Sequence, residues 1–250
     1  MIWLELAQLK ILLCITTKHA SNVSATGFHH LRQLRHIWHS VNRDSAATLV
    51  HAFVTSRVDY CNAVFAAAPK VTTNKLQRVL NAAARVVTGM REFDRGLSQL
   101  LHTELHWLDV PERVKYKLSV MAHWCLSGCA PQYLATYCVP VSSTAARQHL
   151  RSAVRHQLAV PSHRLSTYGR RAFAIAGPTT WNSLPTHLHC VENSTAAFGR
   201  LLKTHLFSTS VYSALGVSAI MRYINRRFTY LLTYGPVWIA WHFNRTDPYE

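Results

Sequence analysis

Residues 72–89, TTNKLQRVLNAAARVVTG, contain the clearest structural signal in the chain. Apolar residues recur there at steps of three and four, which is the spacing of one face of an α-helix. A threonine or asparagine at positions 72–74 is suited to cap the start, and Gly89 stands where a left-handed C-terminal cap belongs. The segment therefore predicts an amphipathic helix with a basic outer side formed by Lys75, Arg78 and Arg85.

The same spacing predicts further helices on both sides of this segment. Their ranges are 28–41, 45–67, 111–127 and 195–207. Two short stretches, 158–160 and 171–175, favour strands instead, because β-permissive residues there are bounded by glycine and proline. The predicted fold class is mainly α, with a helical bundle followed by a smaller α+β region that contains short strands. The change of pattern predicts a boundary within residues 139–150.

Charge is distributed unevenly along the chain. Lys and Arg number 27 and Asp and Glu 11, so the formal net charge is +16. From Arg113 to Thr246 the only acidic residue is Glu192. Such a field attracts polyanions, because each phosphate that a cation neutralises releases condensed counterions. RNA or DNA is therefore the first candidate partner, an anionic membrane surface is the second, and a basic surface without a specific ligand is the third.

Neither end of the chain predicts a membrane span or a secretory signal. The first 17 residues are apolar, but they include Glu5 and Lys10 and lack a basic segment before the apolar stretch. The apolar tail is interrupted by Arg222, Arg226 and Arg227, so no uncharged run is long enough to cross a bilayer. With six scattered cysteines that fit reduced thiols, the chain is predicted to be intracellular, in the nucleus or cytoplasm.

The carboxylates do not form a polymerase site. Templated nucleotide polymerisation needs carboxylates that converge on two Mg²⁺ ions, and the chain has no Asp-Asp pair. The nearest approach, Glu92 and Asp94, is flanked by arginines and fits a salt-bridged turn. The sequence therefore predicts no catalytic residues and no cofactor.

Metal ligands are also incomplete. His102 and His106 could share a metal on one helical face, but no third ligand is evident. Cys125, Cys129 and Cys138 lie near His123, at spacings that match no zinc knuckle, and buried reduced thiols explain them better. We predict no metal site.

Basic residues are the remaining functional signal, in two groups at helical spacing and one group in the acid-free stretch after Glu112. Three groups could contact a nucleic-acid backbone, since each guanidinium or ammonium can neutralise a phosphate. They are Lys75, Arg78 and Arg85; Arg113, Lys115 and Lys117; and Arg147, Arg151 and Arg155. The last three are spaced by four, which would align them if the segment were helical. A solvated basic face is the alternative for each residue.

Several blocks, in one order, resemble a known family. They begin with GFHHLR at 27–32, LVHAFVTSRVDYCN at 49–62 and KLQRVLNAAAR at 75–85. LHWL at 105–108 and APQYL at 130–134 follow, and WNSLP at 181–185 and LKTHLF at 202–207 close the series. Residues 22–208 thereby resemble the region downstream of the polymerase core in jockey-like and chicken-repeat-like LINE (non-LTR retrotransposon) reverse transcriptases.

The resemblance implies a fragment of a reverse transcriptase (RNA-directed DNA polymerase) without palm, fingers or endonuclease. It implies a thumb-like helical domain at 22–139 and a C-terminal α+β region at 140–208, with unmatched segments at 1–21 and 209–250. A thumb holds the primer–template duplex through its backbone. Two departures are Asp109, where the family has proline after His-Trp-Leu, and Arg170, where it has an acid.

Three functions remain open at this point. The first is a non-enzymatic module that binds RNA or DNA backbones. The second is a protein-interaction module that docks on an intact retroelement reverse transcriptase. The third is a decayed retroelement reading frame whose product has no selected function.

Overall fold

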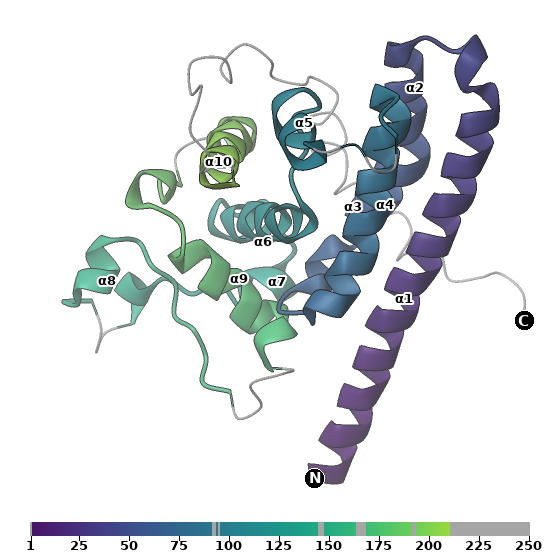
Figure 1. Ribbon diagram of the computed structural model, residues 1–250. Helices are drawn as coiled ribbons and strands as arrows, with labels where there is room; N and C mark the ends of the chain where they lie inside the picture. Colours follow the sequence, from purple (N-terminus) through teal and green to yellow (C-terminus); the bar gives the residue numbers. More distant parts are fainter. Residues whose placement is uncertain are drawn as a thin grey trace, which may run out of the picture.

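A computed structural model describes residues 2–91, 94, 96–144, 148–163, 169–191 and 194–210. The described chain is mainly helical, as the sequence predicts (Figure 1). Its α-helices are α1 (Ile2–Ile37), α2 (Arg43–Val50), α3 (Ser56–Asp59), α4 (Lys70–Thr88), α5 (Leu97–Thr103), α6 (Val110–Leu126), α7 (Gln132–Ala135), α8 (Arg151–Val154), α9 (Phe173–Asn182) and α10 (Thr195–Ser210). A π-helical turn, η2 (His51–Thr55), joins α2 to α3, and short 3₁₀ turns are η1 (Trp38–Ser40), η3 (Asn62–Phe65), η4 (Val141–Ser143), η5 (Gly169–Arg171) and η6 (Thr186–Leu188).

Helix α1 runs parallel to α4 along one side of the molecule (Figure 1). Two contacts show that the helices run in the same direction. Ser21 lies against Lys75, and further along both helices Gly27 lies against Val79. At Gly27 the helices approach so closely that an added Cβ would meet Cγ1 of Val79 at 2.7 Å. Glycine is therefore required here for packing, because any side chain would force α1 away from α4.

Helices α4 and α6 organise the core between them. Leu76 and Leu80 of α4 pack in one apolar cluster with Val110 and Val114 of α6. Four further apolar residues of α4 belong to a second cluster with α1, α2 and η2. Its buried members are Leu31, Leu34, Val50, Val54, Val79, Ala83, Val86 and Val87. The other side of α6 packs in a third cluster against α9 and α10. Each of the two helices is therefore buried on more than one side.

Most of the predicted helices are confirmed, with shifted boundaries. Helix α4 ends at Thr88, and Gly89 takes the predicted left-handed conformation with φ of 72°. Its start differs, because the N-cap is Pro69 and the helix already begins at Lys70. Proline fixes φ near the helical value without needing a hydrogen bond from its own nitrogen, so it can precede a helix directly. The predicted helix at 45–67 is interrupted by η2 and by Cys61, whose φ is 52°.

The predicted short strands are not present among the described residues. Residues 173–175, where Phe173 and Ile175 alternate with alanine, begin α9 instead. In the second stretch Leu158 forms an isolated antiparallel bridge with Pro140. The alternating pattern wrongly predicted a strand, because alanine is equally compatible with a helix. Ile175 and Ala176 are buried in the helix α9.

Two observations bear on the predicted division into domains. The cluster around α6 joins Cys125, before the predicted boundary, to Leu158, Trp181 and Phe198 after it. Helix α1 is continuous across position 21, and Ala20 is fully buried. The predicted tail beyond Ser210 lies outside the described residues.

No helix within the described ranges is long and apolar enough to cross a membrane.

Candidate nucleic-acid interface

The outer side of the α1–α4 pair carries two of the predicted phosphate-binding residues. Lys75 and Arg78 are exposed and stand about one helical turn apart on α4. Nζ of Lys75 donates a hydrogen bond to Oγ of Ser21 on α1, at 3.1 Å. Lys18 is exposed one turn before Ser21. These four residues, Lys18, Ser21, Lys75 and Arg78, define what we call the α1–α4 face.

The α1–α4 face is suited to phosphate oxygens. Its three cations come from two helices that pack rigidly at Gly27 and Val79, so their spacing is fixed by the fold. The Ser21 hydroxyl holds Lys75 without neutralising its charge, because a hydroxyl is not an anion. An ammonium with a neutral partner keeps its attraction for polyanions, whereas an ammonium in an ion pair loses most of it.

Arg85 is only partly on this surface. It lies two turns beyond Arg78 on α4 and is half-buried. Its Nε atom is enclosed and has no hydrogen-bond partner among the described residues. The predicted stripe of three cations on α4 therefore reduces to the exposed pair Lys75 and Arg78.

Arg113, predicted from sequence to contact a nucleic-acid backbone, is buried and is not on an exposed basic surface. Its side chain is 3% exposed, and Nη1 lies 2.7 Å from Oδ2 of Asp59 on α3. Nε also donates to the carbonyl oxygen of Leu108, at 2.7 Å. Because its charge is balanced by a carboxylate inside the protein, Arg113 ties α6 to α3 and does not bind an external anion.

The two lysines near Arg113 on α6 face different environments. Lys115 is exposed. Lys117 is half-buried, and burial lowers its pKa, with the carboxylate of Asp59 acting in the opposite direction. Lys117 is one turn from Arg113 and faces the same carboxylate, so the three predicted residues do not form a common basic surface.

The third predicted group is not aligned on a helix. Helix α8 is a single turn, and Leu150 before it is extended, with φ of −76° and ψ of 151°. Arg151 and Arg155 are exposed at the two ends of this turn. Arg147 lies outside the described residues. Residues 148–155 therefore do not form one continuous helix. The condition for aligning the three arginines on a helical face is not met.

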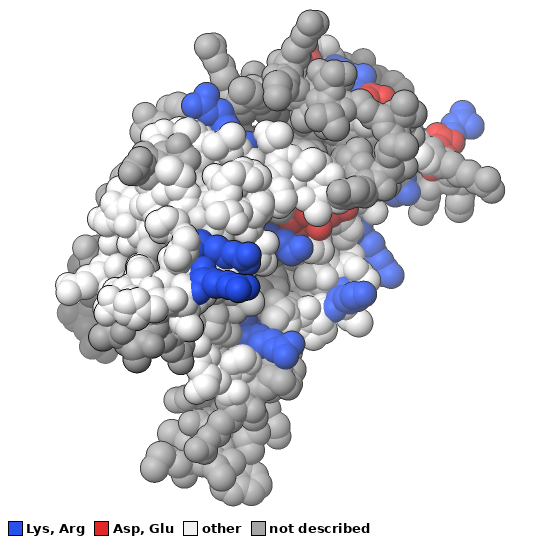
Figure 2. Space-filling model, turned by 90° about the vertical axis from the view of Figure 1, so that its left-hand side faces the viewer, with Lys and Arg blue, Asp and Glu red and all other residues white. Residues whose placement is uncertain are grey.

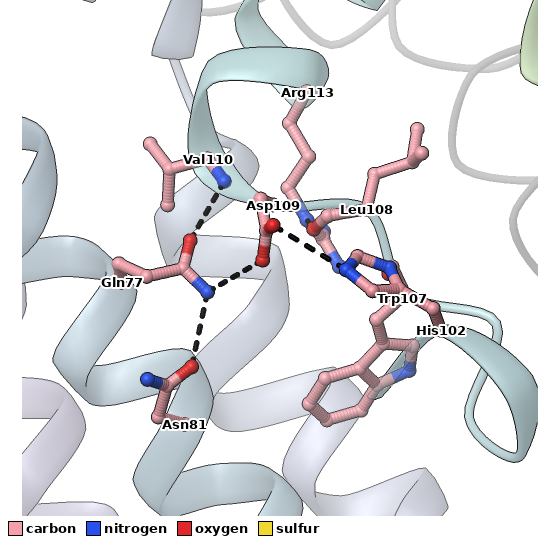
Figure 3. A network of polar contacts seen from close by, with 8 residues as sticks. All are labelled: Gln77, Asn81, His102, Trp107, Leu108, Asp109, Val110 and Arg113. Atoms are coloured by element: carbon pink, nitrogen blue, oxygen red, sulfur yellow. Dashed lines mark hydrogen bonds and ion pairs between the residues drawn. The ribbon is translucent and has the colours of Figure 1, made fainter. Parts of the chain in front are cut away.

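A polar network at the start of α6, which the sequence did not predict, fixes α4, α5 and α6 together (Figure 3). Nε2 of Gln77 donates to Oδ1 of Asp109 at 2.8 Å and to Oδ1 of Asn81 at 3.0 Å. Its Oε1 accepts the N–H of Val110 at 2.9 Å. Gln77 thus supplies a partner to an otherwise unpaired N–H at the first turn of α6. The network sets the position of α6 relative to α4.

His102 completes this network from α5. Its Nε2 lies 3.4 Å from Oδ2 of Asp109, and its Nδ1 lies 3.0 Å from the carbonyl oxygen of Trp107. The hydrogen bond with Asp109 raises the pKa of His102, although burial acts against it. Burial also raises the pKa of Glu112, one turn into α6. The sequence signal was the Leu-His-Trp-Leu-Asp block itself, which places Asp109 directly before α6.

The described residues include no group of three or more His, Cys, Asp or Glu that could hold a metal ion. His102 and His106 do not share a helical face, because α5 ends at Thr103 and His106 has a φ of 51°. Cys125 and Cys138 are buried in the core, while Cys129 is exposed. Asp94 accepts the backbone N–H of Arg91 at 2.8 Å, as expected of a turn.

The side of the molecule that carries α8 is turned to the viewer in Figure 2. Lys and Arg side chains gather near its middle, and Asp and Glu are sparse on it. This agrees with the absence of acidic residues between Glu112 and Glu192. Exposed cations therefore occur on this side as well as on the α1–α4 face.

The chain matches no protein-family profile, no curated protein and no solved structure.

Proposed function

We propose that this protein is a non-catalytic helical module that binds RNA or DNA through the phosphate backbone, with the α1–α4 face as its contact surface. The observation that carries the proposal is the exposed pair Lys75 and Arg78, with Lys75 held by a neutral hydroxyl of α1. The resemblance to the thumb of LINE reverse transcriptases supports it, since a thumb grips a duplex through its backbone.

Binding through this face should not depend on nucleotide sequence. Sequence is distinguished by hydrogen bonds and apolar contacts to base edges, whereas contacts to phosphate fix only position. The exposed lysines and arginine of the α1–α4 face can reach phosphates.

The polymerase reaction is not part of the proposal. Two-metal catalysis needs carboxylates within a few ångströms of each other, and the carboxylates described above are engaged otherwise. Asp59 pairs with Arg113, Asp109 accepts from Gln77, and Asp94 caps a turn. Intact reverse transcriptase activity would require a chain that supplies palm and fingers.

The experiment compares affinities of the purified chain for several duplexes of unrelated sequence, by fluorescence anisotropy at fixed salt. We expect affinities that agree within about tenfold, compared with the factor of about 10³ or more that separates specific from non-specific sites for sequence-reading proteins. Preference for one sequence by that larger factor would contradict backbone binding, and so would the absence of binding at low salt.

A further inference from the structure

Helix α8 presents aliphatic and basic side chains together to solvent. Leu150, just before the turn, is 50% exposed, and Val154, at its end, is 77% exposed. Arg151 and Arg155 are exposed beside them. We call these four residues, Leu150, Arg151, Val154 and Arg155, the α8 tip.

Side chains from the core hold the α8 tip in place. The carbonyl oxygen of Arg155 lies 2.7 Å from Nδ1 of His189, a buried residue. The carbonyl oxygen of His156 accepts Nε1–H of Trp181 at 3.1 Å. Asn182 bonds both the N–H and the carbonyl oxygen of Leu158, each at 2.8 Å. These hydrogen bonds hold the backbone next to Leu150 and Val154 against the core, so the two side chains remain exposed to solvent.

The position of the α8 tip limits the partners that it fits. It lies at the edge of the molecule farthest from α1 and projects outward (Figure 1). The α8 tip is a single exposed turn at that edge, and its aliphatic side chains gain nothing from contact with nucleic-acid phosphates. A bilayer surface accepts both kinds of side chain, because aliphatic groups enter the acyl boundary while guanidinium groups remain among the headgroups.

The positive charge of the α8 tip determines which lipid headgroups it can bind. The α8 tip has two arginines, and no acidic residue occurs in the sequence between Glu112 and Glu192. Anionic headgroups attract such a surface, and neutral ones do not. We propose that the α8 tip is a peripheral docking site for a bilayer that contains anionic phospholipid, with Leu150 and Val154 inserted at the interface and Arg151 and Arg155 bound to lipid headgroups. This inference does not depend on the proposed nucleic-acid binding.

The arginines and the aliphatic side chains of the α8 tip should make modest contributions to vesicle affinity that can be measured separately. Each arginine near an anionic bilayer should strengthen binding about fivefold, so both together contribute on the order of 25-fold. Partial burial of the two aliphatic side chains should add roughly tenfold. Both effects are measurable by sedimentation with vesicles.

The experiment uses the full chain and sucrose-loaded vesicles of two compositions. One contains equal parts of phosphatidylcholine and phosphatidylserine, and the other contains phosphatidylcholine alone. Three double variants are compared with the wild type: Leu150→Ser with Val154→Ser, Arg151→Gln with Arg155→Gln, and Lys75→Gln with Arg78→Gln. The last removes the same charge from the α1–α4 face and is the matched control. All other residues are identical, and circular dichroism checks folding.

On vesicles that contain phosphatidylserine, we expect the Arg151/Arg155 variant to bind about 25-fold more weakly and the Leu150/Val154 variant roughly tenfold more weakly than the wild type. The Lys75/Arg78 control should retain nearly all of its vesicle binding. Equal losses in the control and the Arg151/Arg155 variant would mean that net charge alone drives binding, which overturns the proposal. Unchanged binding of the Leu150/Val154 variant would overturn it as well.

Discussion

The guanidinium of Arg113 on α6 and the carboxylate of Asp59 on α3 form an ion pair of 2.7 Å across 54 positions of sequence. Arg113 is almost fully buried, so loss of the Asp59 carboxylate removes an anion that balances its charge inside the protein. We expect Asp59→Asn to reduce the free energy of unfolding by about 2–4 kcal/mol, somewhat less than for a fully buried pair, because Asp59 is partly exposed. Urea denaturation measures this loss.

A loss of stability below about 0.5 kcal/mol, typical of surface substitutions, would show that the ion pair is not structural.

Gly27 and Val79 give a second prediction, which concerns the packing of α1 on α4. We expect Gly27→Ala to destabilise the protein by about 1–3 kcal/mol, because the new methyl group would meet Cγ1 of Val79 at 2.7 Å. In a Val79→Ala background, which removes that methyl group, the same change should cost much less. A double-mutant cycle by thermal or urea unfolding measures the difference. Additive losses would show that the two helices are not in close contact at this point.

The sequence predicted the helices well where local signals determine them. Apolar residues at steps of three and four and a terminal glycine were sufficient for α4. They were insufficient for α9, where alanines alternating with Phe173 and Ile175 fit a strand and a helix equally and only packing decides. The π turn η2 has no local signature in the sequence.

The candidate interface was predicted in part for the same reason. Lys75 and Arg78 follow from the helical period, because residues opposite the apolar stripe must be exposed. The burial of Arg113 could not be inferred, since its partner Asp59 is distant in sequence. The contact of Lys75 with Ser21 depends on the packing of α1 against α4, and the network of Gln77 and Asp109 depends on how α6 meets α4.

The pair His102 and Asp109 predicts a pH dependence of stability. Asp109 raises the pKa of His102 above its ordinary value of about 6.5. The stabilisation from this pair is therefore fully present below about pH 6.5 and is lost as the pH rises through the folded-state pKa. We expect Asp109→Asn to reduce the free energy of unfolding by about 1 kcal/mol more at pH ~6 than at pH ~9.

Asparagine is the matched replacement in this test. Its side-chain oxygen can still accept the hydrogen bond from Gln77, so the link between α4 and α6 is retained. Burial raises the pKa of Glu112 and the Asp109 carboxylate adds to this shift, so both proteins are compared in a Glu112→Gln background, which removes the Glu112 titration. An equal effect of the substitution at the two pH values would show that protonated His102 gains nothing from Asp109.

Binding of nucleic acid through the α1–α4 face is the central claim, and the salt dependence of binding tests it most directly. The variant Lys75→Gln with Arg78→Gln is compared with the wild type and with Arg151→Gln and Arg155→Gln, which remove the same charge from the α8 tip. Affinity for one duplex is measured over a range of salt concentrations. Because each phosphate contact contributes about 0.9 to the slope of log affinity against log salt, loss of two contacts should reduce its magnitude by about 1.8. We expect this reduction for Lys75 and Arg78, and an unchanged slope for Arg151 and Arg155. A folded Lys75/Arg78 variant with the slope of the wild type would contradict the account, because those cations would then be solvated and without a nucleic-acid partner.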